Sequence, residues 1–238
     1  MQIDFVKVPY TTGPNMIRNT GPVFTSPVNQ EIIQQKKFEL NRYTADLWAQ
    51  APRAEHIVKK AAEYCNVYTE EIIDLALMLE EDVAIMNKGK LAAICFCFPS
   101  GFIPSERIGM SLGDIHKPVG DGELLVKASP GIARVMTEQP SFRRWVWTVT
   151  VNPNLSNHPS TKIDTLPQSI DDLYFRWETQ TTARVDDETS LFFVKIDVVP
   201  LREVWNQRIL DSINSMSDAV LTYKNLHHIK KLLNTLGE

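Results

Sequence analysis

The sequence predicts an α+β domain built on an antiparallel sheet of about five strands, with short helices over one face and further helices at both ends. Three observations support this class. Runs with the alternation of strands are joined by hairpin-type turns, which imply antiparallel pairing. Helical patterns precede the first hairpin and follow the last one. Between the second and third predicted strands, Gly, Pro and Ser interrupt a series of short helical pieces, which we expect to cover one sheet face.

The composition is that of a globular chain. The 238 residues are 43% hydrophobic and 23% charged, enough for one domain with a sizeable core. Residues 1–30, rich in Pro, Thr, Asn and Gly, are predicted to form an arm that lies over the domain or is partly disordered, and residues 31–238 to form a single domain. The net charge of −4 and the dispersed basic residues argue against a nucleic-acid surface.

The sequence also bears on location. It has no 18-residue apolar run and no apolar signal core, which argues against a membrane span and against secretion. It has only three cysteines, an odd, low number that fits a reducing compartment. We therefore expect a cytoplasmic protein.

The first half of the chain predicts helices followed by a hairpin. The pattern is helical over residues 31–80, and Thr69 is the expected N-cap of a helix over EEIIDLALML. The segment EDVAIMNKGKLAAICFCF predicts two strands joined by a turn at residues 87–90. Both faces of the second strand are apolar, so we expect it to be covered on both sides.

The second half predicts three strands and then helices. RRWVWTVTVNP is the third strand, and YFRWETQTTARV and TSLFFVKIDVVPL form a long hairpin across residues 186–188. The chain from residue 202 onward is helical and amphipathic. Its apolar positions are Ile209, Ile213 and Met216, followed by Leu226, Ile229 and Leu233.

The strand over residues 173–185 has the most polar pattern. Alternation places one set of side chains on a single face, namely Tyr174, Arg176, Glu178, Gln180, Thr182 and Arg184. An antiparallel sheet usually turns such a face to solvent, which is the simpler interpretation. The same residues also suit a polarised pocket, in which a glutamate holds a cationic amine or moves protons and an arginine stabilises a developing anion.

The cysteines give no closed metal site. A structural zinc site needs four ligands, and Cys95 and Cys97 have no second pair to complete one. We interpret both as small buried side chains.

The histidines are five in number. His227 and His228 are adjacent on a predicted helix and face different ways, which indicates a solvated face. We expect His56 and His158 at the surface as well. His116, within SLGDIHKPVG, is the remaining one, and a lone histidine is more often structural than a ligand.

Four segments in a fixed order carry a family resemblance: EEDVAIM, CFCFPSGFIPSERIGMSLGDIHKPV, RRWVWTVTVNP, and RWETQTTARVDDETSLFFVKI followed by Pro200-Leu201. Together they resemble the haem-dependent oxidative N-demethylase alpha-subunit family over roughly residues 40 to 205. The resemblance implies a PAS-like fold that binds haem and uses dioxygen to remove a methyl group from a secondary amine.

The resemblance also implies roles for individual residues. The histidine of the family's IH-x-PV run falls on His116, which becomes the axial ligand of a haem b iron. Its second ring nitrogen then needs an acceptor, either Asp114 or a backbone carbonyl. Gly120 stands where the family has a second proline. Arg144 and Lys117 are candidate partners of the haem propionates by their charge.

The polar strand is the other part of the implied site. Glu178, Gln180 and Arg184 match the family's strand and become the candidate catalytic residues, with a small amine-type substrate. The chain lacks the four cysteines of an iron–sulfur cluster and a dinucleotide fingerprint, so the electrons are expected from a separate flavin or iron–sulfur reductase.

Two other functions remain open from the sequence. PAS-like haem domains often sense, so the chain is alternatively a non-catalytic haem-binding or gas-binding sensor. It is otherwise a binding module without haem, in which His116 belongs to the core.

Overall fold

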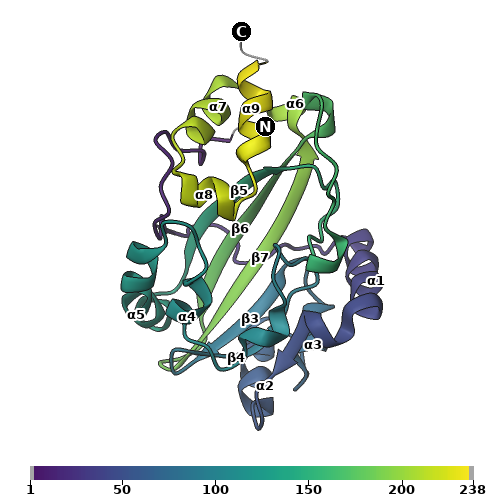
Figure 1. Ribbon diagram of the computed structural model, residues 1–238. Helices are drawn as coiled ribbons and strands as arrows, with labels where there is room; N and C mark the ends of the chain where they lie inside the picture. Colours follow the sequence, from purple (N-terminus) through teal and green to yellow (C-terminus); the bar gives the residue numbers. More distant parts are fainter. Residues whose placement is uncertain (1–2, 236–238) are drawn as a thin grey trace.

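Seven strands of the described chain form one antiparallel sheet in the order β1-β5-β6-β7-β3-β4-β2 (Figure 1). The computed structural model describes residues 3–235. The α+β class is confirmed. The strand number exceeds the expected five because β1 and β2, of two and three residues, are too short to show alternation in a sequence.

In chain order the elements are β1 (Ile17–Arg18), α1 (Gln30–Leu47), β2 (Trp48–Gln50), α2 (Glu55–Tyr64), α3 (Ile72–Ala76), β3 (Asp82–Asn87), β4 (Lys90–Cys95), η1 (Pro104–Arg107), α4 (Leu112–His116), α5 (Glu123–Glu138), β5 (Phe142–Thr150), η2 (Pro159–Thr161), η3 (Ile170–Asp172), β6 (Tyr174–Arg184), β7 (Thr189–Pro200), α6 (Leu201–Val204), α7 (Gln207–Asn214), α8 (Asp218–Tyr223) and α9 (His227–Thr235).

Both predicted hairpins are confirmed. Strands β3 and β4 are joined at Lys88 and Gly89, whose φ angles are 50° and 74°. Two successive positive φ values are what a tight two-residue hairpin loop requires, and glycine adopts them without strain. Strands β6 and β7 are joined across residues 185–188, where the Asp186 carboxylate accepts the backbone N–H groups of Glu188 and Thr189.

The helix predicted to begin at Thr69 is shorter than expected. Only Ile72–Ala76 is helical, and its N-cap residue is Glu71, which makes no side-chain cap. The Thr69 hydroxyl accepts the N–H of Glu71 at 3.1 Å. This local turn competes with the helix for the same backbone groups, and the segment from Leu79 onward enters β3 instead.

The two sheet faces have different cover. Helix α5 packs on β6 and β7, as expected for the helices between the second and third predicted strands. Ala84 and Met86 of β3 line a cavity on that side. Val83 and Ile85 alternate with them and are buried in the core that also contains residues of α2 and α3. The sheet is therefore apolar on both faces at its β3–β4 end.

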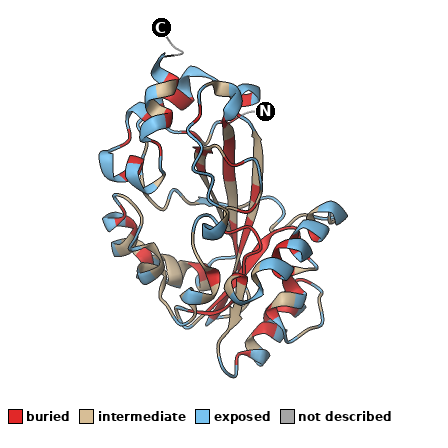
Figure 2. Cartoon of the chain, turned by 45° about the vertical axis from the view of Figure 1, so that its right-hand side comes forward, coloured by how far each residue is buried: buried red, intermediate tan, exposed pale blue. Residues whose placement is uncertain are grey.

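A second core joins the two ends of the chain. Ile209, Ile213, Leu226 and the other apolar residues predicted for the C-terminal helices are buried there. The N-terminal arm closes this core, and its Phe5 ring stacks on Trp145 of β5 at 5.8 Å. Figure 2 shows the buried residues along the strands and on the inner sides of the surrounding helices. Across residues 3–235 we find no helix with the length and apolar character needed to cross a membrane.

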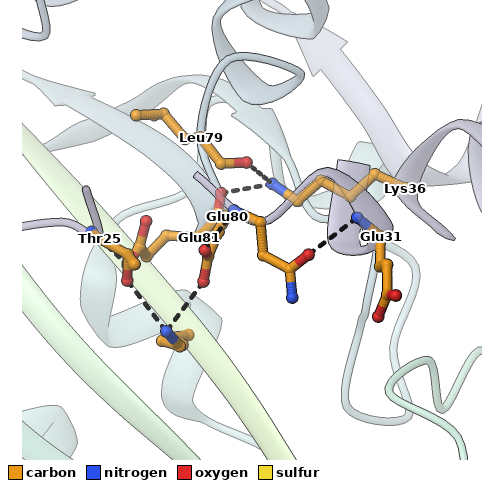
Figure 3. A network of polar contacts seen from close by, with 8 residues as sticks. Thr25, Glu31, Lys36, Leu79, Glu80 and Glu81 are labelled. Atoms are coloured by element: carbon orange, nitrogen blue, oxygen red, sulfur yellow. Dashed lines mark hydrogen bonds and ion pairs between the residues drawn. The ribbon is translucent and has the colours of Figure 1, made fainter. Parts of the chain in front are cut away.

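A fully buried lysine fixes α1 against the sheet (Figure 3). The Lys36 ammonium donates to the carbonyls of Ala76 and Leu79, both at 3.0 Å, and to the carbonyl of Glu81. It also lies 3.7 Å from the Asp82 carboxylate, and both side chains are inaccessible to solvent. Three carbonyl acceptors and one carboxylate together offset the cost of burying this charge.

Replacing Lys36 by methionine is expected to reduce the free energy of unfolding by about 3–5 kcal/mol, because a buried carboxylate and three carbonyls lose their donor. Urea unfolding measures the change. Lys37→Met is the matched control, because Lys37 is exposed on the same helix and should stay near the wild-type value. Equal stability of both variants would contradict a structural role for the buried charge.

Candidate functional site

A cavity of about 800 Å³ lies between one face of the sheet, helices α4 and α5, the end of α8 and the N-terminal arm. This volume falls within the range of roughly 300–1,000 Å³ that small-molecule and cofactor sites occupy. The cavity lies where the short helical pieces that follow β4 were expected to cover the sheet.

The cavity has an apolar part and a polar part. The apolar part comes from β3, β4, β7 and α5, with Met86, Ile94, Phe192, Val194, Leu125, Ile132 and Met136. The polar part comes from β5, β6, the arm and the end of α8, with Arg144, Glu178, Gln180, Tyr10, Tyr223 and Lys224. In the strand register, Gln180 lies between Arg144 of β5 and Val194 of β7, so the polar part follows β5 and β6 and the apolar part begins at β7.

Helix α4 presents His116 to the cavity. The helix is one turn long and begins with a capping box, in which Ser111 and Asp114 each bind the other's backbone N–H. The Nδ1 atom of His116 lies 2.7 Å from the Leu112 carbonyl. A carbonyl only accepts, so Nδ1 carries the proton and Nε2 keeps its lone pair.

The environment of His116 keeps the ring neutral. Burial lowers the pKa of this imidazole below its ordinary value of 6.5. The hydrogen bond to Leu112 opposes the shift, and the nearby Arg144 charge adds to it. Within residues 3–235 the Nε2 atom has no hydrogen-bond partner. A neutral imidazole with a fixed tautomer and a free nitrogen is the form that binds a metal.

His158 also lines the cavity, and both of its ring nitrogens already have hydrogen-bond partners. It was expected at the surface, but it is 1% exposed and stacks on Tyr43 at 4.0 Å. Its Nε2 donates to Asp46 at 3.1 Å, and its Nδ1 accepts the N–H of Ser160. Because neither nitrogen is free, His158 is a structural residue. The expectation that His56, His227 and His228 are exposed is confirmed.

Lys117 lies outside the cavity, on the surface. Its ammonium binds the Asp114 carboxylate at 2.7 Å, and its side chain is 67% exposed. Lys117 and the Ser111 hydroxyl lower the pKa of Asp114 to about 2. Asp114 thus caps α4 and is not the acceptor for His116, a role that the Leu112 carbonyl has instead.

Glu178 is the one carboxylate among the described residues that line the cavity. Its Oε2 accepts from the Gln180 amide at 2.6 Å, and its Oε1 accepts from the Ser100 hydroxyl. Gln180 in turn pairs with Arg144 across β5 and β6. Strand alternation therefore places Glu178 and Gln180 in the cavity, with Arg144 beside them.

Arg184 shares the alternation of this strand face but lies beyond the cavity. It ends β6 at the hairpin, is 42% exposed on its side chain, and pairs with Asp187. The structure thus brings together four of the predicted site residues, His116, Arg144, Glu178 and Gln180. Lys117 and Arg184 are not among them.

Sequence patterns did not single out several residues of the polar part. The Lys224 ammonium donates to the Trp147 carbonyl at 2.8 Å and lies over the Tyr10 ring at 5.5 Å from its centroid. Burial lowers the pKa of Lys224 to about 8. Arg176 is 3% exposed and binds the carbonyls of Phe98 and Leu155 and the Ser100 hydroxyl. Of these residues, the sequence pointed only to Arg176, which lies on the polar face that the alternation of β6 predicts.

The residues present fit a haem. Within residues 3–235, no group of three His, Cys, Asp or Glu side chains could hold a bare metal ion. A haem brings four nitrogen ligands of its own and needs from the protein an axial ligand, apolar walls and cations for its propionates. His116, the β3–β4–β7 wall and Arg144 offer these. Cys95 and Cys97 are buried, 3.9 Å apart, and do not line the cavity, which confirms that they are small buried side chains.

A comparison with models of protein families identifies the family of this chain. The family model described as haem-dependent oxidative N-demethylase, alpha subunit-like, matches residues 30–234, which is most of the chain. A search among curated proteins gave no match. The family match extends beyond the segments that carried the resemblance and includes α1 and the C-terminal helices.

A glycine sets the distance between the α4 loop and α8. A Cβ atom at Gly120 would lie 2.6 Å from the Ala219 carbonyl oxygen and 2.9 Å from Val220 Cα. These atoms belong to backbone, so a side chain at residue 120 would push α8 away. The contact holds the loop that follows His116 next to the helix that precedes Lys224.

Gly120→Ala is expected to reduce the free energy of unfolding by about 1–3 kcal/mol, as overpacking does. Gly131→Ala is the control of opposite sign. Gly131 lies in α5 with nothing within 4 Å of its Cβ position, so this variant should gain roughly 0.5–1 kcal/mol from helix propensity. Denaturant unfolding of the two variants tests both values, and a gain in both would show that the loop and α8 do not pack this closely.

Proposed function

The chain belongs to the haem-dependent oxidative N-demethylase alpha subunit-like family, and on that premise we propose that it is a haem-dependent oxygenase. Its substrate is a small amine, which it N-demethylates or hydroxylates with dioxygen. The observation that carries this proposal is His116, a neutral imidazole on the cavity wall with its Nδ1 proton on the Leu112 carbonyl and its Nε2 free.

We assign a different role to each of the polar residues of the cavity. Bound haem would supply the iron that binds and reduces dioxygen, chemistry that side chains do not provide. His116 would bind the haem iron through Nε2, and Arg144 would pair with a propionate. Glu178, held by Gln180 and Ser100, retains lone pairs for the ammonium of a substrate or for a proton in transfer.

The topology supports a PAS-like assignment. The five longer strands form an antiparallel sheet in which the first hairpin, β3–β4, lies beside the last strand, β7. Helices α4 and α5 connect that hairpin to β5 and cover the cavity. This arrangement leaves a cavity between helices and sheet that includes His116, the histidine of the family's IH-x-PV run.

Absorption spectroscopy tests His116. The protein expressed with added haem precursor should show a Soret band, as should His56→Ala, in which an exposed histidine is removed. His116→Ala should lose or shift the band, because no other cavity histidine has a free nitrogen. An unchanged band in His116→Ala would exclude His116 as the ligand, and no band in folded wild-type protein would remove the oxygenase and sensor functions together.

The reaction needs electrons from another protein. Removing one methyl group consumes dioxygen, two electrons and two protons, and it yields the demethylated amine, formaldehyde and water. The described chain has its three cysteines buried, so we infer a separate flavin or iron–sulfur reductase.

Formaldehyde release measures this dependence. With a ferredoxin and its NADPH-dependent reductase as surrogate donor, secondary amines should release formaldehyde in a dioxygen-dependent reaction. Glu178→Gln should reduce turnover by about 10²–10⁴-fold if the carboxylate transfers a proton. Turnover of the purified chain with NADPH alone would contradict the partner requirement. Haem-loaded protein that binds carbon monoxide but turns over no amine would favour the sensor.

A further inference from the structure

The cavity is lined by cations that have no carboxylate partner. Seven lysines and arginines line it, against one carboxylate, in a chain whose net charge is −4. Only Lys162 among them forms an ion pair within residues 3–235, with Asp164 at 3.2 Å. The other six are Lys7, Arg107, Arg143, Arg144, Arg176 and Lys224. Of these six, Arg176 is buried, Lys7 is exposed and the other four are half-buried. Half-buried cations without an ion-pair partner favour anionic groups from a ligand.

Two of these cations keep most of their donors free. Lys224 uses one N–H on the Trp147 carbonyl and has two left. Arg144 donates only to the Pro14 carbonyl, at 3.4 Å, and keeps the rest of its fork. Arg176 differs, because its two terminal nitrogens are taken by the Phe98–Ser100 and Asn154–Leu155 segments. The cations able to bind a carboxylate near Glu178 are therefore Lys224 and Arg144.

Lys224 is held in place by both ends of the chain. It follows α8, and its ammonium rests over the Tyr10 ring of the arm. The Tyr10 backbone N–H donates to Ser215, and the Tyr10 ring contacts Trp147 edge-on at 6.1 Å. Lys224 binds the carbonyl of Trp147, which follows Val146, the residue opposite Glu178 in the sheet. Arg144 lies two positions before Val146 on the same strand face, so the three charged groups gather in one part of the cavity.

We propose that the substrate carries a carboxylate as well as its amine, as an N-methylated amino acid does. Lys224, assisted by Arg144, binds the carboxylate, and Glu178 binds the ammonium. This inference rests on the proposed function and narrows its substrate class. A haem brings two propionates, fewer than the four half-buried cations that lack an ion pair, and a lone amine would leave the positive side of this cluster without a partner.

Calorimetry on the haem-loaded protein tests the proposal with two ligands. N-methylglycine and N-methylethylamine both contain a secondary ammonium, and only the first has a carboxylate. N-methylglycine should bind about 10- to 100-fold more tightly, the gain expected from a charge-assisted contact. Equal affinities would overturn the proposal.

Two lysine variants locate the carboxylate. Lys224→Gln keeps a donor for the Trp147 carbonyl but removes the charge, and it should abolish the preference while haem content stays unchanged. Lys162→Gln is the matched control and should keep the preference, because Lys162 lines the same cavity but is already paired. Loss of haem in Lys224→Gln with the preference retained would assign Lys224 to a propionate and overturn the inference. Thermal unfolding checks that each variant folds, and the wild-type comparison of ligands stands without them.

Affinity should also depend on pH through Lys224. Burial lowers its pKa to about 8, with Glu178 opposing and Arg144 reinforcing the shift. The protonated form binds the carboxylate, so affinity for N-methylglycine should fall between about pH 7 and about pH 9. The other titratable groups facing it are Tyr10 and Tyr223, whose pKa values burial raises above 10, so both stay neutral. Lys224→Gln should show a flat profile, and a wild-type profile as flat would contradict the assignment.

If the wild type shows no Soret band, the same calorimetry on the protein still reports whether the cavity prefers a carboxylate. Failure of the haem proposal and failure of the carboxylate proposal are thus separate results.

Discussion

The buried Asp82 carboxylate is the constraint on which the cavity depends. Lys36 of α1 supplies its counter-charge, and the backbone N–H groups of Cys97 and Phe98 donate to its two oxygens at 2.9 and 2.8 Å. These bonds fix the chain where it leaves β4. Because a buried carboxylate without its partners is strongly unfavourable, α1, β3 and the end of β4 hold one relative position.

That position is transmitted to the site through hydrogen bonds. The Phe98 carbonyl accepts from Arg176, and Arg176 also donates to Ser100, whose hydroxyl donates to Glu178. Each of these hydrogen bonds holds one side chain against a group that the preceding contact already fixes. The orientation of the cavity carboxylate thus follows from an ion pair in the core, where no ligand reaches it.

Local patterns predicted the α+β class, both hairpins and half of the site. Alternation places Glu178 and Gln180 on the cavity face because strand geometry alone decides on which face a side chain lies. Alternation also placed Arg184 in the predicted site, although Arg184 lies past the end of the cavity. The alternation of a strand does not show how far along it the covering helices extend. Lys117 was predicted from its charge alone, but it binds Asp114, three residues away on the same helical turn, and lies at the surface.

The residues that no pattern gave come from the two ends of the chain. Tyr10 and Lys224 are 214 positions apart in sequence and meet only because the arm and the C-terminal helices close one core over β5 and β6.

His116 and His158 also show what the local sequence does not predict. Both line the cavity, and the groups around each ring decide which can bind a metal. Asp46, from α1, occupies the second nitrogen of His158, whereas α4 satisfies His116 from within its own turn and leaves the other nitrogen free. Whether a ring keeps a free nitrogen therefore depends on a tertiary contact such as the one from Asp46, which the sequence around His158 does not contain.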